Sequence, residues 1–117
     1  MTTVNYRLYH NVSRDRWFGY TEDDPVFLDA TRFAVEGDPS GPEPIVLDVI
    51  YARHNRDDRP DGRYAPSLSV GDVIALDADG RYFAVESFGF RLLDGQPRNV
   101  SDADNWRDAA EAVEVGN

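Results

Sequence analysis

The first stretch of the chain alternates between apolar and polar positions with a period of two. The apolar side of an extended segment over residues 3–12 carries Val4, Tyr6, Leu8 and Val12, with His10 in line with them. Such alternation is typical of a strand that buries one face. We therefore predict a strand over residues 3–12 and an inward position for His10.

The next two segments combine aromatic residues with turn formers. Residues 13–24 are polar around Trp17, Phe18, Gly19 and Tyr20, which predicts a loop whose aromatic side chains cover an edge of the core. A second strand is expected within residues 26–35, best supported over 31–35. The Gly- and Pro-rich run 36–42 then ends it.

After residue 43 the period changes from two to that of a helix. Leu47, Ile50, Tyr51 and His54 recur at i, i+3, i+4 and i+7 and form one apolar stripe. Pro44 suits a first helical turn. We predict a helix over residues 44–55, ended by the turn-forming run 57–62 and followed by an extended segment from residue 65.

The clearest local pattern lies between residues 73 and 86, where two apolar segments flank Asp77-Ala-Asp-Gly80. This predicts a hairpin of strands 73–76 and 81–86. Residues 87–93 are expected to continue or bend the second strand, with Gly89 at a bulge or a close approach.

A short final helix is predicted over residues 102–113, with Ser101 as its cap. Its apolar stripe comprises Trp106, Ala109, Ala110 and Val113. The order of elements predicts one α+β domain over residues 1–117: a curved antiparallel sheet, with a partial barrel left open as one form, one central helix and a short C-terminal helix. Residues 98–117 form an acidic C-terminal helix and tail.

Composition narrows the classes of function. The chain has 117 residues, no Cys and a net charge of -10, and all 12 basic residues are Arg. Without Cys there are no disulfides or thiolate sites, and no apolar run could span a bilayer, so we expect a cytoplasmic protein. Arg alternates with Asp, which disfavours a phosphate-binding stripe. A G+C-rich genome, salt adaptation and function are all open explanations of the acidity.

The polar residues that could bind a metal or take part in catalysis are more simply interpreted as structural. His10 and His54 lie on apolar faces, and no spacing supplies further metal ligands, so no metal site is expected. Ser67, Ser69 and Asp72 are expected to satisfy backbone groups around a turn. Together with His54 they are the only cluster that an enzyme hypothesis could use. We expect no enzyme, no catalytic residue and no cofactor.

The remaining charges are expected on the surface. Asp57, Asp58 and Asp61 lack the register of a calcium loop and predict an exposed turn. Arg59, Arg63 and Arg81 are expected to pair with these carboxylates, or with Asp72 and Glu86, rather than to hold a phosphate.

Aromatic residues exceed what a small domain needs to bury. Tyr82 and Phe83 must point to opposite faces of their strand, which leaves one face for the helix and another for a partner. The candidate partner surface comprises Tyr82, Phe88, Asp102, Asp104, Asp108 and Glu111.

The segment Ser-Leu-Ser-Val-Gly-Asp-Val at residues 67–73, preceded by Arg59-Pro60, resembles the signature of the YodL-like domain of plasmid, phage and conjugative-element proteins. The resemblance extends over roughly residues 3–93, and Tyr82, Phe83 and Gly89-Phe90 also fit it. It implies an accessory domain of mobile elements without established catalytic residues. We interpret one set of residues as its structural motif: Arg59, Pro60, Ser67, Leu68, Ser69, Val70, Gly71 and Asp72.

These observations lead to one main hypothesis and one alternative. The main hypothesis is a non-enzymatic protein-binding accessory module of a phage or mobile element that acts on a host or element-encoded protein. In a narrower form, its carboxylates mimic DNA and inhibit a defence protein. The alternative is a small nucleic-acid-binding barrel with its Arg residues gathered on one face. The sequence leaves the partner and the oligomeric state open.

Overall fold

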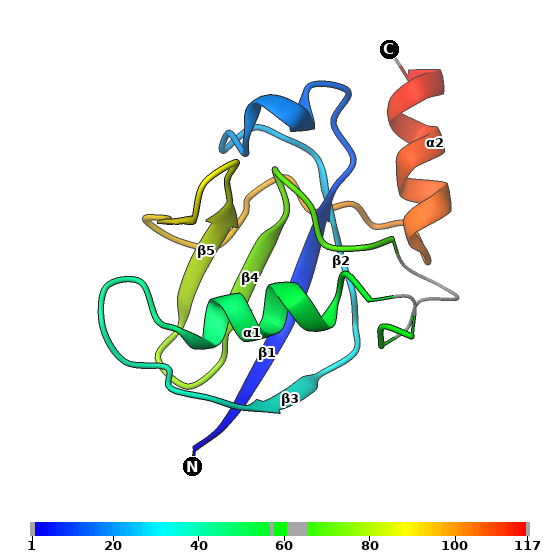
Figure 1. Ribbon diagram of the computed structural model, residues 1–117. Coiled ribbons are helices and arrows are strands. Elements are labelled where there is room, and N and C mark those ends of the chain that lie inside the picture. The colour runs from blue at the N-terminus through cyan, green and yellow to red at the C-terminus, as the bar shows by residue number, and fades with distance from the viewer. Residues whose placement is uncertain (1, 57, 61–65, 117) are drawn as a thin grey trace.

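The computed structural model describes residues 2–56, 58–60 and 66–116 and shows a single antiparallel sheet with a helix across one face (Figure 1). The strands are β1 (Thr3–Asn11), β2 (Val26–Leu28), β3 (Phe33–Glu36), β4 (Val73–Leu76), β5 (Arg81–Val85) and β6 (Phe90–Leu92). They follow the order β2-β1-β4-β5-β6, and β3 also pairs with β1. The predicted α+β class is confirmed. The sheet is open between β2 and β6 and does not close into a barrel.

Strand β1 is the centre of the sheet. The predicted strand is confirmed, but only its first half buries a single face, since Tyr9 and Asn11 on the other side are buried as well. One edge of β1 pairs with β4, and the other edge pairs with β3 near its start and with β2 near its end. The single strand predicted within residues 26–35 is therefore two strands. Asp29 causes the break, because its carboxylate accepts the Thr31 N–H at 2.9 Å and closes a local turn between them.

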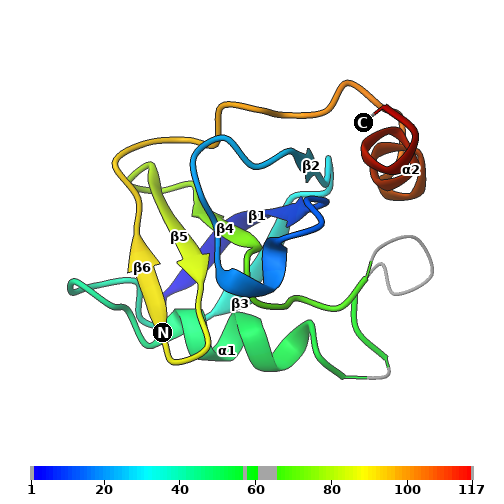
Figure 2. The ribbon, with the colours of Figure 1, turned by 90° about the horizontal axis from the view of Figure 1, so that it is seen from above.

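Helix α1 (Val46–Arg53) lies across the face of the sheet that carries Tyr6 and Phe83 (Figures 1 and 2). It buries Val46, Leu47 and Ile50, whereas Tyr51 is 38% exposed. The helix is thus rotated from the predicted stripe, with Val46 inward in place of Tyr51. The main core on this face comprises Val4, Tyr6, Leu8, Phe33, Val46, Leu47, Ile50, Leu68, Ile74, Leu76, Phe83 and Val85.

The opposite face of the sheet carries a smaller cluster of buried residues: Tyr9, Tyr20, Val26, Val73, Ala75 and Ala84. The predicted hairpin of β4 and β5 is confirmed. Residues 87–93 do not continue β5, however. They turn at Gly89, which has a φ of +77°, and return as the separate strand β6 along β5. A second hairpin therefore replaces the predicted bend.

Helix α2 (Trp106–Gly116) begins later than predicted. The side chain of Asn105, rather than Ser101, caps it, since Asn105 Oδ1 accepts the Asp108 N–H at 2.9 Å. The Ser101 hydroxyl instead accepts the Ala103 N–H at 3.1 Å, before the helix. Within the part of the chain that the structure describes, no helix is long and apolar enough to cross a membrane.

Candidate functional site

The buried carboxylate of Asp72 joins three segments at one end of the sheet. Only 2% of Asp72 is exposed. Its Oδ1 accepts the Asn11 N–H at 2.8 Å and its Oδ2 accepts the Ser69 N–H at 2.9 Å, while its backbone carbonyl accepts the Val85 N–H at 2.8 Å. The carboxylate thus fixes the end of β1 against the turn before β4. The prediction that Asp72 satisfies backbone groups at a turn is confirmed.

The loop that follows β1 packs closely against Gly71. Its φ is +94°, and a Cβ at this position would lie 2.5 Å from the carbonyl oxygen of Arg16. The Gly71 carbonyl accepts the side-chain N–H of Asn11 at 3.0 Å, and Asn11 also donates to Asp24 at 3.0 Å. Residues 13–24 are therefore held against the Ser69–Asp72 turn at both ends.

This loop contains the short 3-10 helix η1 (Arg16–Phe18), and it displays its aromatic side chains rather than burying them. Trp17 is 61% exposed and Phe18 is 92% exposed. The prediction that the loop aromatics cover a core edge is wrong for these two residues and correct for Tyr20, which is buried. Trp17 and Phe18 are exposed because η1 packs against Gly71 at the end of the sheet and not over its face.

The turn between β5 and β6 adds another aromatic residue at the same place. Phe88 is 96% exposed, and the turn is closed by the Glu86 N–H, which donates to the Gly89 carbonyl at 3.0 Å. Trp17, Phe18, Val70 and Phe88 line one hollow of about 430 Å³. We call this group the aromatic end.

The structure separates the residues of the predicted partner surface. Phe88 belongs to the aromatic end, but Tyr82 is partly buried and packs edge-on against Tyr9 with ring centroids 6.2 Å apart. The acidic group Asp102, Asp104, Asp108 and Glu111 is exposed on α2 and just before it. Helix α2 contacts β2, at the opposite edge of the sheet from the β5–β6 turn (Figure 2).

Both histidines are buried, as predicted. The His54 ring lies 2.7 Å from the hydroxyl of Tyr6 through Nε2, and burial raises the pKa of Tyr6 to about 12. His10 Nδ1 lies 3.6 Å from Asp72 Oδ2, and neither ring nitrogen of His10 reaches a hydrogen-bond partner among the described residues. His54 contacts Tyr6, and Asp72 binds the backbone N–H groups of Asn11 and Ser69, so these two residues take part in separate structural contacts.

Two further kinds of site were considered from the sequence, a metal site and a Ser–Asp cluster. The described residues contain no group of three or more side chains that could hold a metal ion. Within the cluster of Ser67, Ser69 and Asp72, Ser69 donates its backbone N–H to the Asp72 carboxylate. Of the other residues of the structural motif, Leu68 is fully buried in the main core and Arg59 and Pro60 are partly buried.

Many surface carboxylates are paired with arginine. The pairs are Arg7 and Arg32 with Asp77, Arg81 with Asp79, Arg91 with Glu86, Arg98 with Glu22 and Arg56 with Asp58. Arg81 pairs with Asp79, its neighbour in the β4–β5 turn, and not with one of the carboxylates that were predicted. Exposed pairs of this kind contribute roughly 0–1 kcal/mol each. Arg63, Asp57 and Asp61 lie outside the described residues.

Trp17 and Phe18 are the residues that the predicted site lacked. Their sequence signal is weak: two large aromatic residues follow Arg14-Asp15-Arg16 without alternation. Such a run fits a buried loop as well as an exposed one, and only the position of Gly71 against Arg16 decides between them.

Comparison with known proteins places the motif in a family. The family model of the YodL-like domain matches residues 35–95, which is just over half of the 117 residues. The match includes α1, the Ser67–Asp72 turn and β4 to β6, but begins after β1 and η1, later than the resemblance from residue 3 suggested. Neither the curated proteins nor the solved structures gave a match. The chain belongs to the YodL-like domain family.

Proposed function

We propose that the chain is a non-enzymatic protein-binding accessory module of a phage or other mobile element, which acts in the host cytoplasm on a host or element-encoded protein. The observation that carries this proposal is the aromatic end. Trp17, Phe18 and Phe88 project from two separate loops and line one hollow. Clustered exposed aromatic residues are typical of protein interfaces.

Buried hydrogen bonds and strand pairing hold the loops that carry the aromatic end. Asp72 and Gly71 fix the η1 loop through buried hydrogen bonds, and the β5–β6 hairpin fixes Phe88. Binding therefore does not require ordering of these loops, which lowers the entropic cost of association. In this proposal the family motif is structural, and the loops that it holds bind the partner.

The charge distribution favours a protein partner over the alternative of nucleic acid. At least six of the 12 Arg residues are paired with carboxylates, as in Arg81 with Asp79 and Arg91 with Glu86, which makes them less available to phosphates. The narrower hypothesis of a DNA mimic that inhibits a defence protein draws on the exposed acidic group on α2. That group shares no residue with the aromatic end, so the two surfaces can be tested separately.

The test compares the wild-type chain with a Phe18→Ser/Phe88→Ser double variant in affinity capture from host lysate at low and high salt. Both side chains are almost fully exposed, so the variant should keep the wild-type melting temperature. We expect a protein that the wild type retains at high salt and that the double variant loses.

A control variant changes one exposed apolar residue away from the aromatic end, Val49→Ser on the outer side of α1. This control should capture the same protein as the wild type. Retention of the same protein by the folded double variant, or capture of nucleic acid alone, would contradict the proposal. A protein that elutes with salt from both variants would instead favour charge mimicry.

A further inference from the structure

The hollow of the aromatic end combines apolar walls with a negative charge. Trp17, Phe18 and Phe88 supply three rings from two loops, and Val70 adds an aliphatic contact. Among the described residues that line the hollow, Glu86 alone carries a formal charge. Its side chain is 37% exposed, so a ligand in the hollow can reach it. The lining therefore distinguishes a cationic ligand from an anionic one.

The Glu86 carboxylate keeps one oxygen free although it is paired with Arg91. Arg91 Nε donates to Glu86 Oε2 at 3.2 Å, and a second nitrogen of Arg91 donates to the Tyr20 carbonyl at 2.6 Å. No described residue donates to Glu86 Oε1. Arg91 does not line the hollow, so it holds the carboxylate in place without filling the space beside it. Glu86 can thus accept a further hydrogen bond and keep Arg91.

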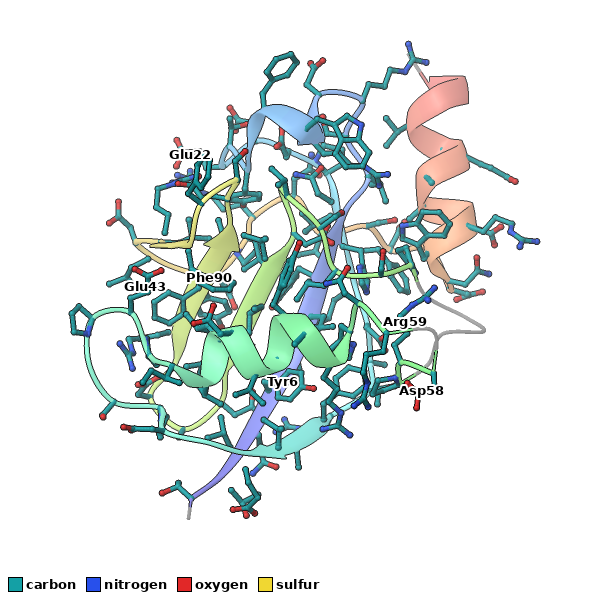
Figure 3. All side chains as sticks on the ribbon, in the orientation of Figure 1. Tyr6, Glu22, Glu43, Asp58, Arg59 and Phe90 are labelled. Atoms are coloured by element: carbon teal, nitrogen blue, oxygen red, sulfur yellow. The ribbon has the colours of Figure 1, made fainter. Side chains whose placement is uncertain are left out.

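Glu43, another carboxylate near the β5–β6 turn, is used by the backbone instead. Its Oε1 accepts the Phe90 N–H at 3.1 Å, and Figure 3 shows Glu43 beside Phe90. Gly89 makes room for it, since a Cβ there would lie 2.7 Å from the same oxygen. Glu43 is not among the residues that line the hollow. Glu86 is therefore the carboxylate that a bound ligand would meet.

The rings of the aromatic end favour a cation as well. The face of an aromatic ring is negative and attracts ammonium and guanidinium groups within about 6 Å. Trp17 already makes such a contact, because Arg16 Cζ lies 4.5 Å from its ring centroid. Arg16 donates to the Asn11 carbonyl at 3.2 Å and does not line the hollow, so it leaves the hollow side of Trp17 uncovered. An acidic ligand would meet both Glu86 and the negative ring faces.

We propose that the hollow binds an arginine or lysine side chain of the partner protein. The cationic group donates to Glu86 Oε1, and the aliphatic stem packs against the aromatic rings. This inference rests on the proposed protein-binding function and names the chemistry of its ligand. A basic residue on the partner also suits the net charge of -10 of this chain. A cation enclosed by rings is screened less by salt than an exposed pair, which agrees with the retention expected at high salt.

The proposal is tested with a displayed library of random short peptides, selected on the wild-type chain. We expect selected peptides that contain arginine or lysine and that do not bind Phe18→Ser/Phe88→Ser. Replacing that residue by its neutral counterpart, citrulline for arginine or norleucine for lysine, should weaken binding to the wild type about tenfold. The same replacement should weaken binding to Glu86→Gln less than about threefold, because the variant has already lost the charge.

Two control variants separate charge from packing. Asp79→Asn removes another carboxylate paired with arginine, at the other end of β5, and should bind every peptide as the wild type does. Phe88→Leu keeps an apolar side chain but loses the ring. It should weaken the basic peptides roughly threefold and leave the neutral ones unchanged. Melting temperatures check that each variant is folded.

Three results would overturn the proposal. The first is a set of peptides that need Phe18 and Phe88 but contain no basic residue, which would leave the proposed protein-binding function intact. The second is equal binding of a basic peptide to the wild type and to folded Glu86→Gln. The third is an absence of peptides that depend on the aromatic end. If Glu86→Gln does not fold, the citrulline and norleucine peptides decide on the wild type alone.

Discussion

Gly71 combines a left-handed backbone with a close contact, so it is the most sensitive residue of the family motif. At a φ of +94°, with the Arg16 carbonyl 2.5 Å from a built Cβ, Gly71→Ala must strain its backbone and displace the η1 loop. We expect a loss of roughly 2 kcal/mol in unfolding free energy, measured by thermal and urea denaturation.

Ser67→Ala and Ser69→Ala are the matched controls for Gly71→Ala. The hydrogen bond from Ser69 to Asp72 uses the backbone N–H, which alanine retains, so each control should cost less than about 1 kcal/mol of unfolding free energy. Ser variants that fold normally and yet lose all binding or activity would show that the motif is functional and not structural.

The buried Tyr6 hydroxyl makes the fold sensitive to alkaline pH. Burial raises the Tyr6 pKa from 10.0 to about 12, so the folded state favours the neutral phenol. Because the folded pKa lies above the unfolded one, this stabilisation is complete below about pH 10 and is lost as the pH rises towards 12, at a total of roughly 2–3 kcal/mol. Urea unfolding at rising pH should show this decline.

Tyr6→Phe provides the control for the pH effect. It loses the contact with His54 at every pH, and its stability should fall less steeply above about pH 10. Some decline remains, because burial also raises the pKa of Tyr9 and of Tyr20. Parallel curves for wild type and Tyr6→Phe would show that Tyr6 is not the titrating group.

At the scale of elements, α2 is the place to test whether charge contributes to association. Converting Asp102, Asp104, Asp108 and Glu111 to Asn or Gln removes four exposed negative charges. If the carboxylates bind the partner, association at low salt should slow by about tenfold or more while the fold is kept. The association rate is measured by surface binding kinetics at several salt concentrations.

The circular-dichroism spectrum of the charge variant provides the control, because Asp108 also contacts the helix cap Asn105. An unchanged association rate in a folded variant would exclude α2 from the binding mechanism. The aromatic end around Phe18 and Phe88 would then carry the interaction.

At the scale of the whole molecule, the sheet and α1 should fold without α2. The two core clusters contain no residue of α2, although Ala109 is buried against β2. A chain that ends at Ser101 keeps the Ser101 N–H bond to the Val26 carbonyl. We expect cooperative unfolding with a loss of roughly 2 kcal/mol, measured by urea denaturation. Loss of cooperative unfolding would place α2 within the folding unit.

The sequence by itself determined the elements whose signals are local. β1 was predictable because alternate positions face one core, and the β4–β5 hairpin because Asp77-Ala-Asp-Gly80 encodes a turn between apolar segments. The contact of Asp72 with the Ser69 N–H was predictable for the same reason, since short polar side chains at turns bind nearby backbone groups, whereas its bond to the distant Asn11 N–H was not. These interactions connect residues close together in the chain or act through a simple period.

Only the tertiary structure decided where the aromatic residues lie. Trp17 and Phe18 are exposed because Gly71, far along the chain, holds their loop at the end of the sheet. The position of Glu43 against Phe90 and the open edge of β6 likewise depend on contacts between distant segments. Such contacts have no period in the sequence, because packing and chain connectivity, rather than local propensity, select them.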